Sequence, residues 1–288
     1  MRAKLGEVFG IRAECWHGKV RKWSGYQNRV DLAYPGDRGE RVDLGLVAWG
    51  GESQRGTLHV SLNGKGCAHI ENFGGADAWG GVKAWGESVG AWIARVDVAH
   101  DDFEGRTVNI EKVLDWYRNG GFANSGRPPA AELIDDLGSG KGRTLYVGNR
   151  KHGKLCRVYE KGKKEGDPAS PWVRVEVEWR RKNRVIPWDI LVRPGEFLAG
   201  AYPCLGYLSE RQDKIRTLRR AGAINYEGMV RNLRLSGGKA INAMLHVEKG
   251  DAGAVVTQLV RDGYPKRLEP FAAMDGVLDE IRHADVEP

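Results

Sequence analysis

The chain has 288 residues, and its 45 Lys and Arg side chains against 38 Asp and Glu give a formal net charge of +7. Hydrophobic residues make up 41%, with ten Trp and six Phe, which suffices for a core and excludes a disordered or fibrous chain. No apolar run approaches the roughly 18 residues that a membrane span requires. Glycine, at 40 residues, has twice its usual share of about 7%. This excess favours turns and strands over a helical bundle.

The cysteines also restrict the class of protein. Cys15, Cys67, Cys156 and Cys204 stand far apart and form no C-x-x-C pair. No histidine pair stands near them at zinc spacing, so we expect neither a zinc ribbon nor a disulfide scaffold. The first residues, Met-Arg-Ala-Lys-Leu-Gly-Glu, lack the apolar stretch of a signal peptide. We expect a reduced, cytoplasmic protein.

The positive charge is concentrated in one segment. Residues 141–184 hold 14 basic and 5 acidic side chains, a net charge of +9, whereas residues 1–140 hold 17 and 19. A solvated charged surface is the alternative interpretation of any basic run. This segment, however, also contains four aromatic side chains, Tyr146, Tyr159, Trp172 and Trp179. Cations that neutralise phosphates, beside rings that stack on unpaired bases, are typical of proteins that bind single-stranded nucleic acid.

The first half of the chain reads as strands and helices separated by glycine. Residues 57–62 alternate like a strand, and Asn63-Gly64-Lys65-Gly66 predicts a tight turn with residues 67–73 as the returning strand. Helical spacing follows over residues 79–93, and alternation over 95–99 predicts another strand. A further helix is expected over 107–118, because Gly120 and Gly121 stand directly behind it.

The second half changes character after Pro187 and Pro194. Before them we expect a hairpin of residues 143–147 and 155–161 and a strand over 172–180. After them, Ser209-x-x-Gln212 predicts a capping box for a helix that runs to Arg220. Two more helices are expected over 239–248 and 252–262. The fold class is thus α+β, an antiparallel-sheet domain with flanking helices over 1–195 and a small helical domain over 196–288.

The predicted strand at residues 95–101 carries two carboxylates. In Arg95-x-Asp97-x-Ala99-x-Asp101, period-two alternation places Asp97 on the face of Arg95 and Ala99, with Asp101 at the strand end. Carboxylate oxygens so placed suit Mg²⁺ or Mn²⁺. The alternative is a strand end with solvated acids.

A second acidic pair lies inside the basic segment. Arg174-x-Glu176-x-Glu178 places two carboxylates on one face of a strand, where like charges repel unless a cation lies between them. Either a metal ion or the flanking Arg174 and Arg180 could supply that charge. Both interpretations stay open.

A tyrosine in the basic segment is a candidate nucleophile. Arg157-x-Tyr159-x-Lys161 predicts one strand face on which two cations flank the phenol and favour its phenolate. A phenolate can attack phosphorus when a metal polarises the phosphodiester. The alternative is a half-buried aromatic whose hydroxyl reaches water.

These residues occur as an ordered series that resembles a known family, the replication initiation factors of certain rolling-circle plasmids and filamentous bacteriophages, to which some conjugative-element relaxases are similar. The resemblance covers roughly residues 55–190. It rests on five motifs: Asn63-Gly64-Lys65-Gly66, Arg95-x-Asp97-x-Ala99-x-Asp101, Tyr146-x-Gly148-x-Arg150, Arg157-x-Tyr159-x-Lys161 and Arg174-x-Glu176-x-Glu178.

The resemblance implies a site-specific DNA nickase and strand transferase that lacks the two-histidine motif. In such proteins a tyrosine attacks the origin phosphodiester, becomes linked to the 5′ phosphate, leaves a 3′ hydroxyl for a host polymerase, and later religates the strand. Tyr159 matches this nucleophile, with Tyr146 as its rival. The residues that match the divalent-metal site are Asp97, Asp101, Glu176 and Glu178. Those expected to hold the phosphate are Arg150, Arg157 and Lys161.

Further cations of the basic segment are expected to contact DNA. They are Lys151, Lys154, Lys163, Lys164, Arg180 and Arg181. The expected partners are origin DNA in single-stranded or hairpin form and the helicase and polymerase of a bacterial host, with a homodimer compatible and no membrane involved. Two alternatives remain: a DNA- or RNA-binding regulator without catalysis, and a conjugative relaxase with the same chemistry.

Overall fold

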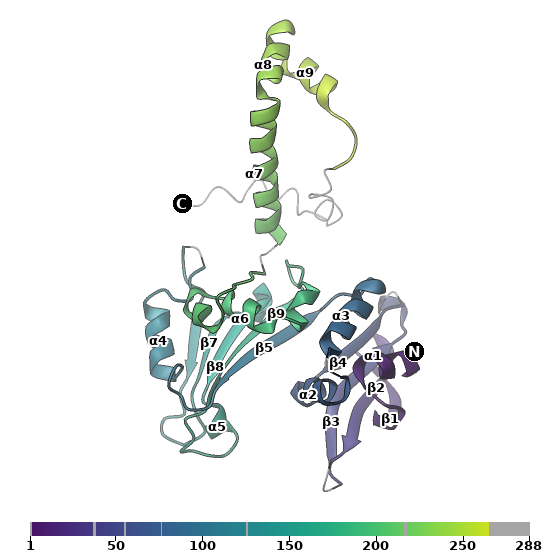
Figure 1. Ribbon diagram of the computed structural model, residues 1–288, viewed down its shortest axis with the longest axis vertical. Helices are drawn as coiled ribbons and strands as arrows, with labels where there is room; N and C mark the ends of the chain where they lie inside the picture. Colours follow the sequence, from purple (N-terminus) through teal and green to yellow (C-terminus); the bar gives the residue numbers. More distant parts are fainter. Residues whose placement is uncertain are drawn as a thin grey trace. The chain divides into compact units, whose positions relative to one another are not determined.

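The computed structural model describes residues 2–264 apart from residues 37, 38, 55, 76, 125, 216 and 217. The chain forms two compact units (Figure 1), residues 1–92 with 188–194, and residues 93–187 with 195–288. This division differs from the boundary expected near residue 195. Glycines with positive φ occur in the loops of both units, so no change of composition marks the passage from one to the other.

The first unit is an antiparallel sheet with three helices. Its strands lie in the order β1 (Trp16–Trp23), β2 (Tyr26–Pro35), β3 (Arg41–Trp49), β4 (Leu58–Leu62). The helices are α1 (Arg2–Phe9), α2 (Gly64–Phe73) and α3 (Ala78–Ser88), with short 3₁₀ turns η1 (Ala13–Cys15), η2 (Glu52–Gln54) and η4 (Trp188–Leu191). Leu32, Leu44 and Ile70 are fully buried in the common core, which stabilises the sheet against the helices.

The hairpin expected at residues 57–73 is wrong in its second half. β4 exists, but Asn63 begins α2 rather than a turn, and its side chain accepts a hydrogen bond of 2.9 Å from the backbone N–H of Gly66. Asparagine is favoured both in tight turns and as a helix cap, so the residue type alone does not separate the two. The close approach of Gly66 to the backbone of Leu44, where a Cβ would meet the carbonyl oxygen at 2.1 Å, fixes the helical packing.

The second unit contains a five-stranded antiparallel sheet in the order β5-β9-β8-β7-β6. The strands are β5 (Arg95–Asp102), β6 (Ala131–Ile134), β7 (Thr144–Asn149), β8 (Lys154–Tyr159) and β9 (Val173–Arg180). The hairpin and the two long strands expected from the sequence are thereby confirmed. Together with the helices, this sheet confirms the α+β fold class.

The two faces of this sheet differ in chemistry. On β9, Val173, Val175, Val177 and Trp179 are buried, and the residues between them are charged. The apolar face includes Lys154 of β8, whose ammonium lies 3.6 Å from the ring of Tyr202, and that ring contacts Phe122 at 5.1 Å. The opposite face carries the charged side chains. We call it the polar face.

The remaining helices complete the second unit. They are α4 (Ile110–Arg118), α5 (Lys161–Lys164), α6 (Pro194–Ala199), α7 (Leu218–Ser236), α8 (Gly238–Val247) and α9 (Ala252–Leu259), with 3₁₀ turns η3 (Arg150–His152) and η5 (Pro203–Leu208). The structure thus has helices near the expected positions 107–118, 239–248 and 252–262. None of the helices in the described residues is long and apolar enough to cross a membrane.

The capping box expected at Ser209 is wrong. Ser209 has extended backbone after η5, and the described residues up to 215 are not helical. The Gln212 side chain donates back to the carbonyl of Gly206 at 3.4 Å instead of reaching Ser209. The helix begins at Leu218.

Candidate functional site

The acidic strands and the tyrosine strand lie next to one another, as the sequence motifs predict. In one cross-strand row Asp101 pairs with Arg174, and Arg174 pairs with Tyr159. In the next row Ala99 pairs with Glu176, Glu176 pairs with Arg157, and Arg157 pairs with Tyr146. Because side chains alternate along a strand, all these residues share the polar face. Asp97 and Glu178 form the third row of the same face.

Tyr159 is nearly buried, with 9% of its surface exposed. Its hydroxyl donates a hydrogen bond to Glu176 Oε2 at 3.3 Å, and the ammonium of Lys164 lies 5.0 Å from its ring centre. Burial, followed by the charge of Glu176, raises the pKa of Tyr159, and Arg174 opposes this only in part. The expectation that flanking cations favour a phenolate is therefore wrong for the free protein. Ionisation of Tyr159 needs a proton acceptor.

Lys161 does not share the strand face of Tyr159. β8 ends at Tyr159, and Lys161 begins the short helix α5. Its ammonium pairs with Glu165 and lies 5.6 Å from the ring of Trp172. Lys161 thus lies beside Trp172, whereas the sequence motif predicted that it shares a strand face with Tyr159.

Arg157 links two of the expected metal ligands. Its Nη2 donates to Glu176 Oε1 and lies 3.4 Å from Asp97 Oδ2. Asp97 is also held by Arg95, whose Nε donates to Oδ1 at 2.7 Å. The arginine therefore lies between carboxylates of β5 and β9.

Glu178 is the most buried carboxylate of the polar face, with 1% of its surface exposed. Three guanidinium groups surround it: Arg95 at 3.2 Å, Arg150 at 3.1 Å and Arg180 at 2.5 Å. Burial alone would raise the pKa of Glu178, but the hydrogen bonds from Arg180 and Arg150 and the charge of Arg95 outweigh it, so that the pKa lies below its usual value. Arg150 and Arg180 are thus anchored at this carboxylate.

Asp101 joins the tyrosine row to an aromatic residue. Arg174 donates to both of its oxygens, at 2.8 and 2.6 Å, and the indole N–H of Trp172 donates to Oδ1 at 2.7 Å. Burial would raise the pKa of Asp101, yet these bonds lower it below the usual range. The two parallel hydrogen bonds fix the orientation of the Arg174 guanidinium relative to the Asp101 carboxylate.

The carboxylates have the oxygen chemistry that Mg²⁺ and Mn²⁺ prefer, but their arrangement does not fit an ion centre. Asp97, Asp101, Glu176 and Glu178 are each bonded to at least one arginine. Within the described part of the chain, no three His, Cys, Asp or Glu side chains gather where they could hold a metal ion. The polar face is a network of alternating charges.

The expected DNA-binding lysines fall on different surfaces. Lys154 lies on the apolar face, where its buried ammonium donates to the carbonyl of Ala201, and burial lowers its pKa to about 7. It lies on the opposite face of the sheet from Tyr159, because side chains alternate along β8. Lys164 is exposed beside the ring of Tyr159, and Lys163 pairs with Glu160 at 2.9 Å. Lys151 and Arg181 are exposed, at η3 and after β9.

An exposed aromatic residue at the end of β5 was missed by the sequence reasoning. Phe103 is 62% exposed and its ring centre lies 5.1 Å from that of Trp172. The sequence does contain an indication, because Phe103 stands between Asp102 and Glu104. A phenylalanine among charged residues is not expected to be buried.

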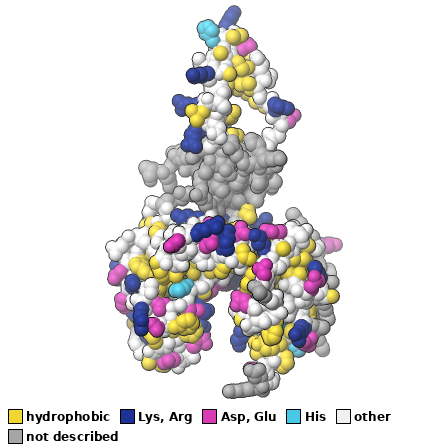
Figure 2. All heavy atoms as spheres, in the orientation of Figure 1, with side chains coloured by type: hydrophobic (Ala, Val, Ile, Leu, Met, Phe, Trp, Pro, Cys, Tyr) yellow, Lys and Arg dark blue, Asp and Glu magenta, His cyan; other side chains and the backbone are white. Residues whose placement is uncertain are grey.

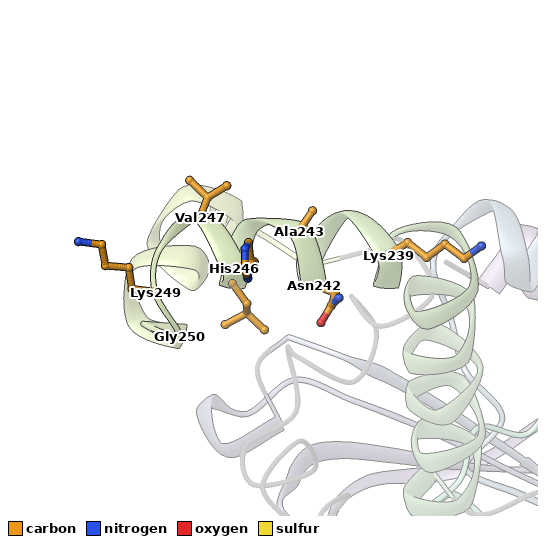
Figure 3. Close-up of a pocket in the computed structure, with 8 residues that line it drawn as sticks. Lys239, Asn242, Ala243, His246, Val247, Lys249 and Gly250 are labelled. Carbon is orange, nitrogen blue, oxygen red and sulfur yellow. The ribbon is translucent and has the colours of Figure 1, made fainter.

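Charged side chains of both signs are interspersed over the visible surface in Figure 2. A hollow on α8 and the turn after it (Figure 3) is lined by Lys239, Asn242, Ala243, Leu245, His246, Val247, Lys249 and Gly250. It contains none of the residues expected to act in catalysis. The polar face therefore remains the candidate site.

Comparison with known proteins defines the class. Residues 91–211, which include the entire polar face of the five-stranded sheet, match the model of the family described as replication initiation factor. This match over residues 91–211 confirms the resemblance to replication initiation factors seen in the sequence.

A solved structure shares the fold. It is the rolling circle replication initiator protein from Geobacillus stearothermophilus, with a TM-score of 0.51 and 24% sequence identity over 69% of this chain and 74% of that chain. No curated protein matches the chain.

Proposed function

We propose that this chain initiates rolling-circle replication by nicking one strand of origin DNA through Tyr159. The observation that carries the proposal is the hydrogen bond of 3.3 Å from the Tyr159 hydroxyl to Glu176, on a charged sheet face within the replication initiation factor domain. The carboxylate is within reach to take the phenol proton during attack, and the raised pKa of Tyr159 makes such an acceptor necessary.

The reaction is a transesterification. As the Tyr159 oxygen bonds to phosphorus, its proton passes to Glu176, and the bond from phosphorus to the 3′ oxygen breaks. The 3′ oxygen takes a proton from water, and the 5′ phosphate stays on the tyrosine. Religation reverses these steps. Arg157, which holds the other oxygen of Glu176, orients the base and adds positive charge near the phosphate.

Binding of the strand falls to cations around the polar face. Lys164 lies above the Tyr159 ring, and Lys151 and Arg181 are exposed. Arg150 keeps 46% of its side chain exposed while it holds Glu178, so it can also meet a phosphate. Arg95 and Arg180, which are bonded to Asp97 and Glu178, fix the face rather than the DNA.

A divalent ion belongs to this proposal only as an expectation from the resemblance. The four carboxylates would have to release their arginines to hold it, so no step above passes through it. Titration of the nicking reaction with Mn²⁺ and with EDTA tests whether the ion is required.

The decisive experiment uses supercoiled DNA that carries the sequence flanking the gene. Tyr159→Phe should abolish nicking and the covalent protein–DNA adduct and leave binding intact. Tyr146→Phe is the matched control, since it lies on the same face and should keep both activities. Unchanged nicking by Tyr159→Phe contradicts the assignment, and loss of the adduct in Tyr146→Phe alone would move it to that residue.

A binding regulator without catalysis is the second candidate, because Asp97, Asp101, Glu176 and Glu178 are each paired with an arginine. In that case the wild-type protein would bind the same DNA and give no nick under any metal condition. A conjugative relaxase would share the nicking chemistry, and only the DNA that supports the reaction would differ.

A further inference from the structure

We propose that Phe103 binds an unpaired DNA base next to the scissile phosphate, with Trp172 as its support. This inference rests on the proposed nicking by Tyr159, because it assigns a nucleobase site beside that residue. The exposed ring has no role in the core of the fold, and its position is fixed by the contacts described below.

The turn that carries Phe103 is held from within. Asp102 accepts hydrogen bonds from the backbone N–H groups of Thr107 at 2.7 Å, Val108 at 2.8 Å and Glu104 at 3.2 Å. Gly105, with φ +63°, closes the turn, and a Cβ there would lie 2.7 Å from the carbonyl oxygen of Pro171. Phe103 is thus presented on a preorganised loop.

Contacts connect this ring to the nucleophile. The ring planes of Phe103 and Trp172 are inclined by 34° at a centroid distance of 5.1 Å. The Trp172 indole is fixed by Asp101, Asp101 holds Arg174 by two bonds, and Arg174 is the cross-strand neighbour of Tyr159. A base on Phe103 would therefore be placed by the same network that places the hydroxyl.

The chemistry around the rings fits a nucleotide. Lys161 Nζ and Arg174 Cζ lie 5.6 and 5.9 Å from the Trp172 ring centre, and Lys164 lies over Tyr159. The nearby acids are engaged, since Glu104 pairs with Arg106 and Glu165 with Lys161. The exposed ring of Phe103 can stack a base, and the cations beside Trp172 and Tyr159 can attract the phosphate of the same nucleotide. The ring is too small to bury an apolar protein partner.

The test is an abasic scan in the Tyr159→Phe background, so that binding is measured without chemistry. Fluorescence anisotropy follows oligonucleotides that span the nick site, intact or with one abasic residue at each flanking position. Phe103→Ala should weaken binding of the intact strand by roughly 5- to 100-fold. It should have no effect on the oligonucleotide that lacks the stacked base. Phe103→Trp should bind like the parent.

Phe73→Ala is the control, because Phe73 is a similarly exposed ring, at 59%, on α2 of the first unit. Equal losses for Phe103→Ala on intact and on every abasic strand would overturn the inference, as would tight binding by Phe103→Ala. A dependence seen only with RNA of the same sequence would also overturn it. These results leave the nicking test of Tyr159→Phe untouched, so failure of the base site and failure of the proposed function are distinguished.

Discussion

The hydroxyl of Tyr159 on β8 and the carboxylate of Glu176 on β9 are joined by a hydrogen bond of 3.3 Å, and the other oxygen of Glu176 is held by Arg157. The carboxylate is therefore oriented before any substrate arrives. Orientation of a base by a third group is the usual arrangement around an activated nucleophile.

Replacement of the base tests this arrangement. Glu176→Gln keeps the shape of the side chain but removes the proton acceptor, so we expect nicking to fall by roughly 10²- to 10⁴-fold while DNA affinity is kept. Single-turnover nicking at several pH values measures it. Because the pKa of Tyr159 is raised, the residual rate of Glu176→Gln should climb with pH as the phenol ionises. A flat profile would contradict the role of Glu176.

Two lysines of the basic segment should differ in DNA binding. Lys164→Met removes an exposed cation beside Tyr159 and should weaken binding to single-stranded DNA. The slope of log affinity against log salt should decrease by about 0.7, the value for one phosphate contact. Lys154→Met changes a buried cation on the other face and should leave both unchanged. An altered salt slope in Lys154→Met would show that DNA reaches that face.

Lys154 should also control stability at alkaline pH. Its pKa is lowered to about 7 by burial, whereas an unfolded lysine titrates near 10.4. Between these values the unfolded chain binds the extra proton, so this group makes the free energy of unfolding rise as pH increases from about 7 to about 10. Urea unfolding at pH 7 and pH 10 should show the free energy of unfolding of the wild type rising relative to that of Lys154→Met. Parallel changes in both proteins would disprove it.

The Asp101 ion pair should stabilise the fold at neutral pH. Its pKa is lowered in the folded state, so its contribution is present above the unfolded value near 3.9 and is lost as pH falls through the folded pKa. Asp101→Asn should lower the free energy of unfolding at pH 7 by about 2 kcal/mol, since it weakens hydrogen bonds to a charged group. At pH 2 the difference from wild type should shrink. Asp115→Asn, at an exposed helix pair, is the control.

The sequence predicts the strands of the polar face well, because alternation of charge and valine in residues 172–180 is a local pattern. The pairing of charges is not local. Asp101 and Arg174 are 73 residues apart, and only the antiparallel register of β5 with β9 brings them together. Without that register, Asp101 and Glu176 resemble metal ligands as much as arginine partners.

Other differences have local causes. Asn63 suits a turn and a helix cap equally, and the close packing of Gly66 against Leu44 of β3 decides for the cap. Lys154 follows the same alternation as the valines, so its burial was readable from β8 once the strand was placed. A lysine at an apolar position is uncommon, and the charge of the whole segment concealed it.

The position of β5 at the edge of its sheet has a consequence for folding. β7, β8 and β9 follow one another closely in the chain, whereas β6, β7 and β8 separate β5 from β9 in the sequence, and in the described part of the chain β5 pairs with β9 alone. Closing such a long loop is entropically costly and slow. We therefore expect the β5 edge of the polar face to form last during folding and to open first. Hydrogen exchange of the β5 amides would report the integrity of the site while the β7–β8–β9 sheet stays closed.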